Sequence, residues 1–179
     1  ADRKFRDAPL ALGDLHQQLG ELERARDDYQ QAMKAVEGDQ GTYSLVLDRL
    51  AVNALSRGDA GEAQRAQQGS LRILRHIGDK HGQAVALQTL GGISARLGDR
   101  TAAELSFREA LSLARRLEDQ RLTADLLVGL ADLEIQRGAR REAARNVEEA
   151  LTIQKAVGDA RGQIAALQLR ARLHRQAGK

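Results

Sequence analysis

The histidines are the side chains in this sequence best suited to do chemistry. His76 and His81 flank Asp79, and two imidazoles with one carboxylate can bind a divalent metal ion at a turn. Charged and polar turn residues are far more often solvated surface than metal ligands, so we expect no metal site there. For His16 we expect packing in the core rather than a role in catalysis.

Paired carboxylates are the other candidates for catalysis. Asp27 adjoins Asp28 and Glu148 adjoins Glu149, and both pairs have basic neighbours, so we expect charges on helix surfaces rather than an acid–base pair. The sequence has no zinc-protease, phosphate-loop or serine-hydrolase motif. It has no cysteine, which excludes thiolate chemistry and disulfides. We therefore predict a protein that is not an enzyme and uses no cofactor or metal.

The composition favours helices. Hydrophobic residues make up 42% of the 179 residues and charged residues 30%, whereas aromatic residues make up only 2% and there is one proline. No apolar run approaches the roughly 18 residues of a membrane span. The absence of cysteine fits a reducing compartment, so we expect a cytoplasmic protein, and the excess of arginine over lysine favours a bacterial source.

Turn residues divide the chain at regular intervals. One series has a spacing of 38 and then 40 residues, and a second series, each member followed by an aspartate, lies about half a period away. The first comprises Gly20, Gly58, Gly98, Gly138 and Gly178, and the second Gly38, Gly78, Glu118 and Gly158. This spacing predicts paired helices that end in left-handed glycines and begin at capping aspartates. Asp59 and Glu62 predict a capping box.

Small residues recur at fixed distances from these turns and predict where helices cross closely. Gly13 and Gly91 belong to one such column, so we expect both to serve packing rather than phosphate binding. The columns are Gly13, Ala51, Gly91 and Ala131; Ala25, Ala63, Ala103 and Ala143; and Ala32, Ser70, Ala110 and Ala150.

These residues carry a resemblance to a known family. Leu12, Gly13, His16, Gly20, Ala25, Tyr29 and Ala32 resemble the tetratricopeptide repeat pattern in order and spacing, as do Leu90, Gly91, Gly98, Ala103, Phe107 and Ala110. The period of about 40 residues is similar to the family's long variant. The resemblance implies an all-α superhelical solenoid with four helix pairs and one C-terminal helix. We expect one domain over residues 1–179, with repeats at about 6–40, 41–79, 80–119 and 120–159 and an extra helix at 162–177.

The resemblance also implies a function. The family's concave groove holds a peptide or partner helix, so we expect a non-catalytic scaffold that binds protein. The matching groove positions are Asp14, Gln17, Gln18, Asp48, Arg49, Val52, Ser56, Gln88, Thr89, Gly92, Arg96, Asp125, Val128, Asp132, Gln136 and Arg172. Their alternating charges predict binding that weakens with added salt. The alternative is a ligand-sensing regulatory segment of a larger bacterial signalling protein or transcription regulator.

Some positions depart from the repeat. Gln67 and Val147 stand where Tyr29 and Phe107 would fill the core, and Gly69 interrupts the helix that carries Gln67. The last helix has two apolar rows, one with Ile164, Leu167 and Ala171 and the other with Leu169 and Leu173, so we expect it to need two neighbours. It is a cap, a helix followed by further repeats, or a surface for self-association. Its basic residues lack interleaved aromatics, so we expect no nucleic acid partner and no membrane partner.

Overall fold

Helices joined by short turns make up the described backbone. The computed structural model describes the backbone of residues 3–177 and the side chains of residues 8–176, so Gly178 and Lys179 lie outside it. Within that range the elements are α1 (Arg3–Gln18), α2 (Leu22–Ala35), α3 (Gln40–Ser56), α4 (Ala60–His76), α5 (Lys80–Arg96), α6 (Arg100–Arg116), α7 (Gln120–Gln136), α8 (Arg140–Ala156) and α9 (Ala160–Ala177). The all-α prediction of four helix pairs and one C-terminal helix is confirmed.

The helix ends follow the predicted turn chemistry. Seven turn glycines have φ between 70° and 93°, and Glu118 takes the same left-handed conformation at φ 56°. Six aspartates each accept a backbone N–H from three residues further on, at 2.8–3.1 Å; they are Asp39, Asp59, Asp79, Asp99, Asp119 and Asp159. The capping box at Asp59 is only half formed, because the carboxylate of Glu62 pairs with Arg57 instead.

The predicted small-residue columns lie at the helix crossings. A Cβ on Gly13 would lie 2.5 Å from the Tyr29 ring, and a Cβ on Gly91 would lie 2.6 Å from the Phe107 ring. Where the facing residue is the smaller Gln67 or Val147, the column holds alanine instead, and those alanines, Ala51 and Ala131, are fully buried. The glycines therefore serve packing, as the sequence predicts, because an aromatic ring leaves room for nothing larger.

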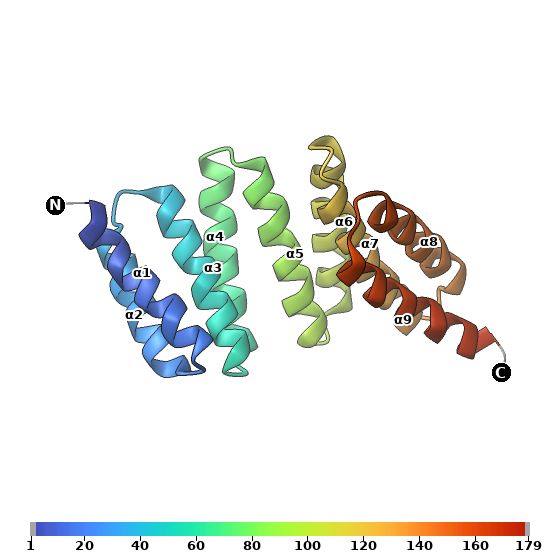
Figure 1. Ribbon diagram of the computed structural model, residues 1–179, viewed down its shortest axis with the longest axis horizontal. Coiled ribbons are helices and arrows are strands. Elements are labelled where there is room, and N and C mark those ends of the chain that lie inside the picture. The colour runs from blue at the N-terminus through green and yellow to red at the C-terminus, as the bar shows by residue number, and fades with distance from the viewer. Residues whose placement is uncertain (1–2, 178–179) are drawn as a thin grey trace.

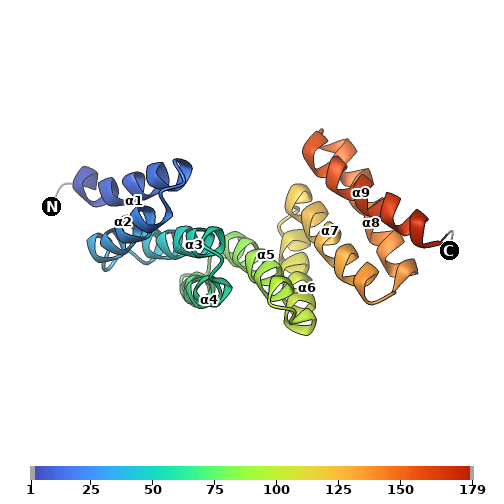
Figure 2. The ribbon, with the colours of Figure 1, turned by 90° about the horizontal axis from the view of Figure 1, so that it is seen from below.

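The helix pairs stack into a curved ribbon with the two termini at opposite ends (Figure 1). Each odd-numbered helix packs on the even-numbered helix that follows it and on the one before it. Direct contacts also join α1 to α3, α5 to α7 and α7 to α9, so the odd-numbered helices approach one another closely on one side of the ribbon. Figure 2 shows this side as the hollow of the arch. We call the odd-numbered helices the inner wall.

The first helix pair is shorter than the others. α2 has 14 residues, whereas α4, α6 and α8 each have 17. The sequence explains the difference. The turn glycine Gly38 comes six positions after Ala32, whereas Gly78 comes eight positions after the corresponding Ser70. The missing residues shorten α2 at its C-terminal end, next to the start of α3.

Candidate functional site

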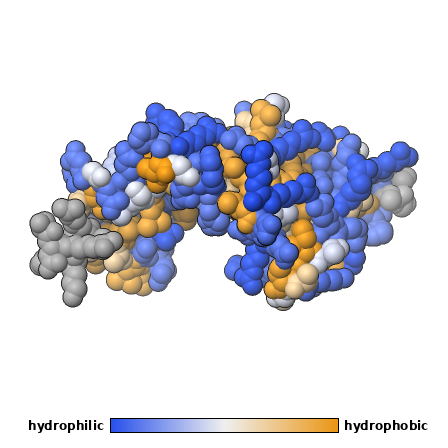
Figure 3. All heavy atoms as spheres, turned by 90° about the horizontal axis from the view of Figure 1, so that it is seen from above, coloured by the Kyte–Doolittle hydropathy of each residue, from blue (hydrophilic) through white to orange (hydrophobic). Residues whose placement is uncertain are grey.

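All sixteen predicted groove residues lie on the inner wall, between α1 and α9. The space-filling view shows the molecule hollowed between its two ends, with apolar patches set among larger hydrophilic areas (Figure 3). These residues are thus carried by the odd-numbered helices, and their hydrogen bonds and ion pairs show which of them the chain itself holds.

Two ion pairs join predicted groove residues of neighbouring repeats. Arg49 Nε lies 3.1 Å from Asp14 Oδ1, and Arg172 Nη1 lies 2.7 Å from Asp132 Oδ1. Asp14 also accepts a hydrogen bond at 2.9 Å from the hydroxyl of Tyr29, whose pKa is raised by burial and by this hydrogen bond. These four charged side chains therefore link neighbouring helices of the inner wall to each other and are already paired within the chain.

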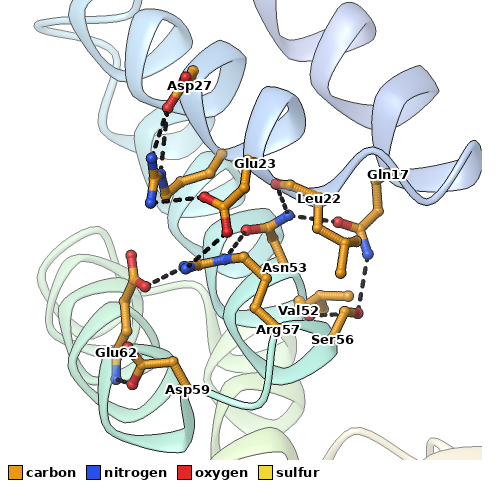
Figure 4. Close-up of polar contacts among 11 residues, drawn as sticks. Gln17, Leu22, Glu23, Asp27, Val52, Asn53, Ser56, Arg57, Asp59 and Glu62 are labelled. Atoms are coloured by element: carbon orange, nitrogen blue, oxygen red, sulfur yellow. Dashed lines mark hydrogen bonds and ion pairs between the residues drawn. The ribbon is translucent and has the colours of Figure 1, made fainter.

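A polar network holds Gln17 and Ser56 in place (Figure 4). The buried amide of Asn53 donates to Gln17 Oε1 and to the carbonyl of Leu22, both at 2.8 Å, and Gln17 Nε2 donates to Ser56 Oγ at 3.1 Å. Arg57 donates to Asn53 Oδ1 at 3.0 Å and pairs with Glu62. The inner wall is consequently rigid and hydrogen-bonded between α1 and α3.

Asp48 lies deeper in the wall than its neighbours. Gln67 donates a hydrogen bond to it at 2.9 Å. Burial raises the pKa of Asp48, and hydrogen bonds to its carboxylate only partly oppose that rise. Asp48 thus supports the α3–α4 contact and is a poor candidate for binding a partner's charge.

The middle of the inner wall has charges that the chain itself does not pair. No ion pair or hydrogen bond within the described residues holds the side chain of Arg96 or Asp125. Partial burial raises the pKa of Asp125, and repulsion from Asp159 and Asp119 raises it further. Gly92, one turn before Arg96 on α5, adds open space there, because a Cβ built on it meets nothing within 4 Å.

An apolar strip crosses the same region. Leu45, Val52 and Val85 are 40%, 45% and 37% exposed, on α3 and α5. Val52 belongs to the predicted groove, but Leu45 and Val85 do not. A signal was available for both, because they share the column of the predicted residue Asp125 at spacings of 40 residues. Apolar residues at helical spacing usually indicate a buried helix face, so the sequence alone does not distinguish this exposed strip from the core.

Most of the candidate catalytic and metal-binding residues have structural partners, whereas within the described residues no ion pair or hydrogen bond holds His76. Asp79 caps α5, and His81 Nε2 lies 3.2 Å from Asp119 rather than beside His76. His16 is not fully buried as expected; it is half-buried and forms a 2.5 Å hydrogen bond with Asp28. No cluster of three or more potential metal ligands occurs among the described residues.

The last helix has one packed row and one exposed row. Leu169 and Leu173 pack against the cluster that α7 and α8 form. Ile164 and Leu167 are 59% and 40% exposed. Part of its basic charge is neutralised, because Arg170 pairs with Glu148 at 3.7 Å.

None of the helices among the described residues is both long enough and apolar enough to span a bilayer.

The sequence matches one known protein family. Two family models, both described as tetratricopeptide repeat, match residues 42–116 and 10–35, which together are more than half of the chain. No curated protein matches the sequence.

Solved structures match the fold across nearly the whole chain. BtubC of P. vanneervenii has a TM-score of 0.74 at 20% identity, over 95% of this chain and 80% of its own. A signal transduction ATPase with numerous domains from Pyrococcus horikoshii, which carries a tetratricopeptide repeat sensor, scores 0.86 at 21% identity over 94% of this chain. Aspartyl phosphate phosphatase F of Bacillus subtilis scores 0.89 at 11% identity over 96% of this chain. This chain spans only 27% of the ATPase and 46% of the phosphatase.

Proposed function

Because this chain belongs to the tetratricopeptide repeat family, we propose that it is a non-catalytic module that binds a peptide or partner helix along its inner wall. The observation that carries the proposal is the exposed apolar strip of Leu45, Val52 and Val85, which adjoins the open position at Gly92. A protein exposes such a strip on a hollowed surface at a cost in solvation, which a bound apolar side chain would offset.

The charges around the strip have two roles in this proposal. The pairs Asp14–Arg49 and Asp132–Arg172 hold neighbouring repeats in register before a partner arrives. Arg96 and Asp125 are available to the partner's own charges. Because exposed ion pairs each contribute less than about 1 kcal/mol, apolar contact supplies most of the affinity and added salt weakens it only modestly.

Substitution of the strip tests the proposal. We expect Val52→Glu with Val85→Glu to abolish capture of the proteins that the unchanged chain retains from a cell extract, as measured by quantitative mass spectrometry. Leu105→Glu is the matched control, because Leu105 is 64% exposed on the outer helix α6. The proposal fails if the double variant, shown to be folded by circular dichroism, retains the same proteins as the control.

A second candidate function is ligand sensing within a larger signalling protein. It is favoured by the match to the ATPase whose repeats are described as a sensor. Under this candidate the inner wall binds a regulatory ligand, and the signal passes to a neighbouring domain. An ATPase or DNA-binding domain encoded in the same reading frame would favour it, and a reading frame that encodes these repeats alone would exclude it.

A further inference from the structure

A second concave surface lies on the outer side of the ribbon, between α2 and α4. Three adjoining hollows of about 400, 400 and 270 Å³ open there, and Tyr43 lines all three. Met33 and Lys34 of α2 form one wall, and α4 forms the other. We call this surface the outer groove.

Two departures from the repeat create the outer groove. The first is the short α2, which leaves the start of α3 uncovered near Tyr43. The second is Gly69, which stands 40 residues before Glu109 and 80 before Glu149. Those glutamates bind the preceding outer helix, through Arg75 at 2.7 Å and Arg115 at 2.6 Å. At the α2–α4 junction no such side chain bridges the gap.

The α4 wall of the outer groove is basic. Arg65, Arg72 and His76 lie on one face of α4, at steps of seven and four residues, and all three line one of the two hollows of about 400 Å³. Within the described residues no ion pair or hydrogen bond holds any of them. Two acidic residues also line the outer groove: Glu37 lines the hollow beside Met33, and Glu37 and Asp39 line the hollow beside the α2–α3 turn. The hollow that Arg65 and Arg72 line has no acidic residue, so the positive charge is concentrated along α4.

We propose that the outer groove binds a short acidic segment of a partner protein. An apolar side chain of the segment packs on Tyr43 and Met33, and two carboxylates pair with Arg65 and Arg72. The two arginines are seven residues apart, or about 10 Å along the helix, which is too far for one small anion to bridge. Residues three apart in an extended peptide of polyproline II geometry point to the same side and lie about 9 Å apart, which is close to this distance. None of the residues that line this surface is among the sixteen predicted groove residues.

Gly69→Glu is the sharpest test variant. It restores the side chain present in the next two repeats and places a carboxylate four residues after Arg65 and three before Arg72. A Cβ there meets only the end of the Leu47 side chain, at 3.2 Å, so the variant should fold, and loss of a mid-helix glycine favours the helix. Arg65→Gln with Arg72→Gln is the second variant. Arg141→Gln with Arg145→Gln on α8 is the control, since it removes equal charge elsewhere.

The probe is a displayed library of random twelve-residue peptides, selected on the full chain. We expect enriched peptides with two acidic residues three apart beside an apolar residue. Their dissociation constants should rise about tenfold for Gly69→Glu and for the Arg65/Arg72 variant, and stay unchanged for the control.

Enrichment without acidic residues, or binding that survives both groove variants, overturns the proposal. Peptides lost only with Val52→Glu and Val85→Glu would locate binding on the inner wall instead. A single-stranded oligonucleotide that binds more tightly than the peptides and is lost with the same groove variants would also overturn it.

Discussion

At the scale of single residues, ring size and backbone spacing are matched across each helix pair. Tyr29 and Phe107 face glycine, whereas Gln67 and Val147 face alanine. The match explains why glycine stands in the middle of these helices, where it otherwise destabilises a helix by up to about 1 kcal/mol relative to alanine. The sequence alone predicted that these columns pack closely, because the spacing is visible in one repeat after another.

The match predicts a coupled pair of substitutions. Gly91→Ala should lower the free energy of unfolding by about 1–2 kcal/mol, because the strain against the Phe107 ring outweighs the gain in helix propensity. In a protein that already carries Phe107→Val, Gly91→Ala reproduces the Ala131–Val147 pair and should not lower the free energy of unfolding. Urea unfolding of the four proteins measures the coupling, and additive effects would contradict the match.

The buried carboxyl of Glu134 predicts a dependence on pH. Burial raises the pKa of Glu134, although Asn146 donates a hydrogen bond to it at 2.8 Å. The native state therefore binds the proton more tightly than the unfolded chain, and stability falls as the pH rises from about 4.5 through the raised native value. Glu134→Gln should add up to about 1 kcal/mol at pH 7 and nothing at pH 3.5. Thermal unfolding at both pH values measures this effect. An equal gain in stability at both pH values would show that the buried charge of Glu134 is not its cause.

At the scale of helices, start and end signals were predictable and side-chain partners were not. Glycine–aspartate turns identify the ends directly, because the left-handed turn and the cap depend on local residues. The partners of Asp14 and Asp132 lie 35 and 40 residues away, so they depend on how repeats stack. The outer groove needed both the shorter α2 and the register of Gly69, and neither shows its effect until the helices are placed.

Two of the described helices, α2 and α8, begin without a side-chain cap, and α8 begins at a residue that has no polar side chain. Ala139 stands at the start of α8 with backbone angles close to those of Asp99 at the start of α6, but has no side chain to accept a hydrogen bond. Ala139→Asp should therefore raise the free energy of unfolding by about 1 kcal/mol, and Asp99→Ala should lower it by a similar amount. Chemical denaturation measures both. An unchanged midpoint for Ala139→Asp would mean that the N–H groups at the start of α8 are already satisfied by water.

At the scale of the whole molecule, stability is distributed unevenly along the ribbon. The largest buried cluster extends from Leu71 on α4 to Leu133 on α7 and has Phe107 within it. The clusters nearer the two ends are smaller. Because each repeat contacts only its neighbours, the ends can open without the centre.

Amide hydrogen exchange should therefore show a gradient. We expect the slowest exchange in α5, α6 and α7 and the fastest in α1 and α9, because the end helices each lack a neighbour on one side. Exchange followed by mass spectrometry on peptic fragments resolves the helices. Equal protection from α1 to α9 would indicate that the chain opens only as one cooperative unit.

The Phe107 ring has a consequence for how such a chain evolves. A Cβ on Gly129 of the next repeat would lie 3.1 Å from this ring, and the counterpart of Gly129 one period later is Leu169. Genetic recombination that removed residues 120–159 would therefore set a leucine against an aromatic ring that leaves little room even for a Cβ. The repeats look interchangeable in sequence, but their order is constrained by contacts between adjacent units, and copies can be lost or gained only where those contacts agree.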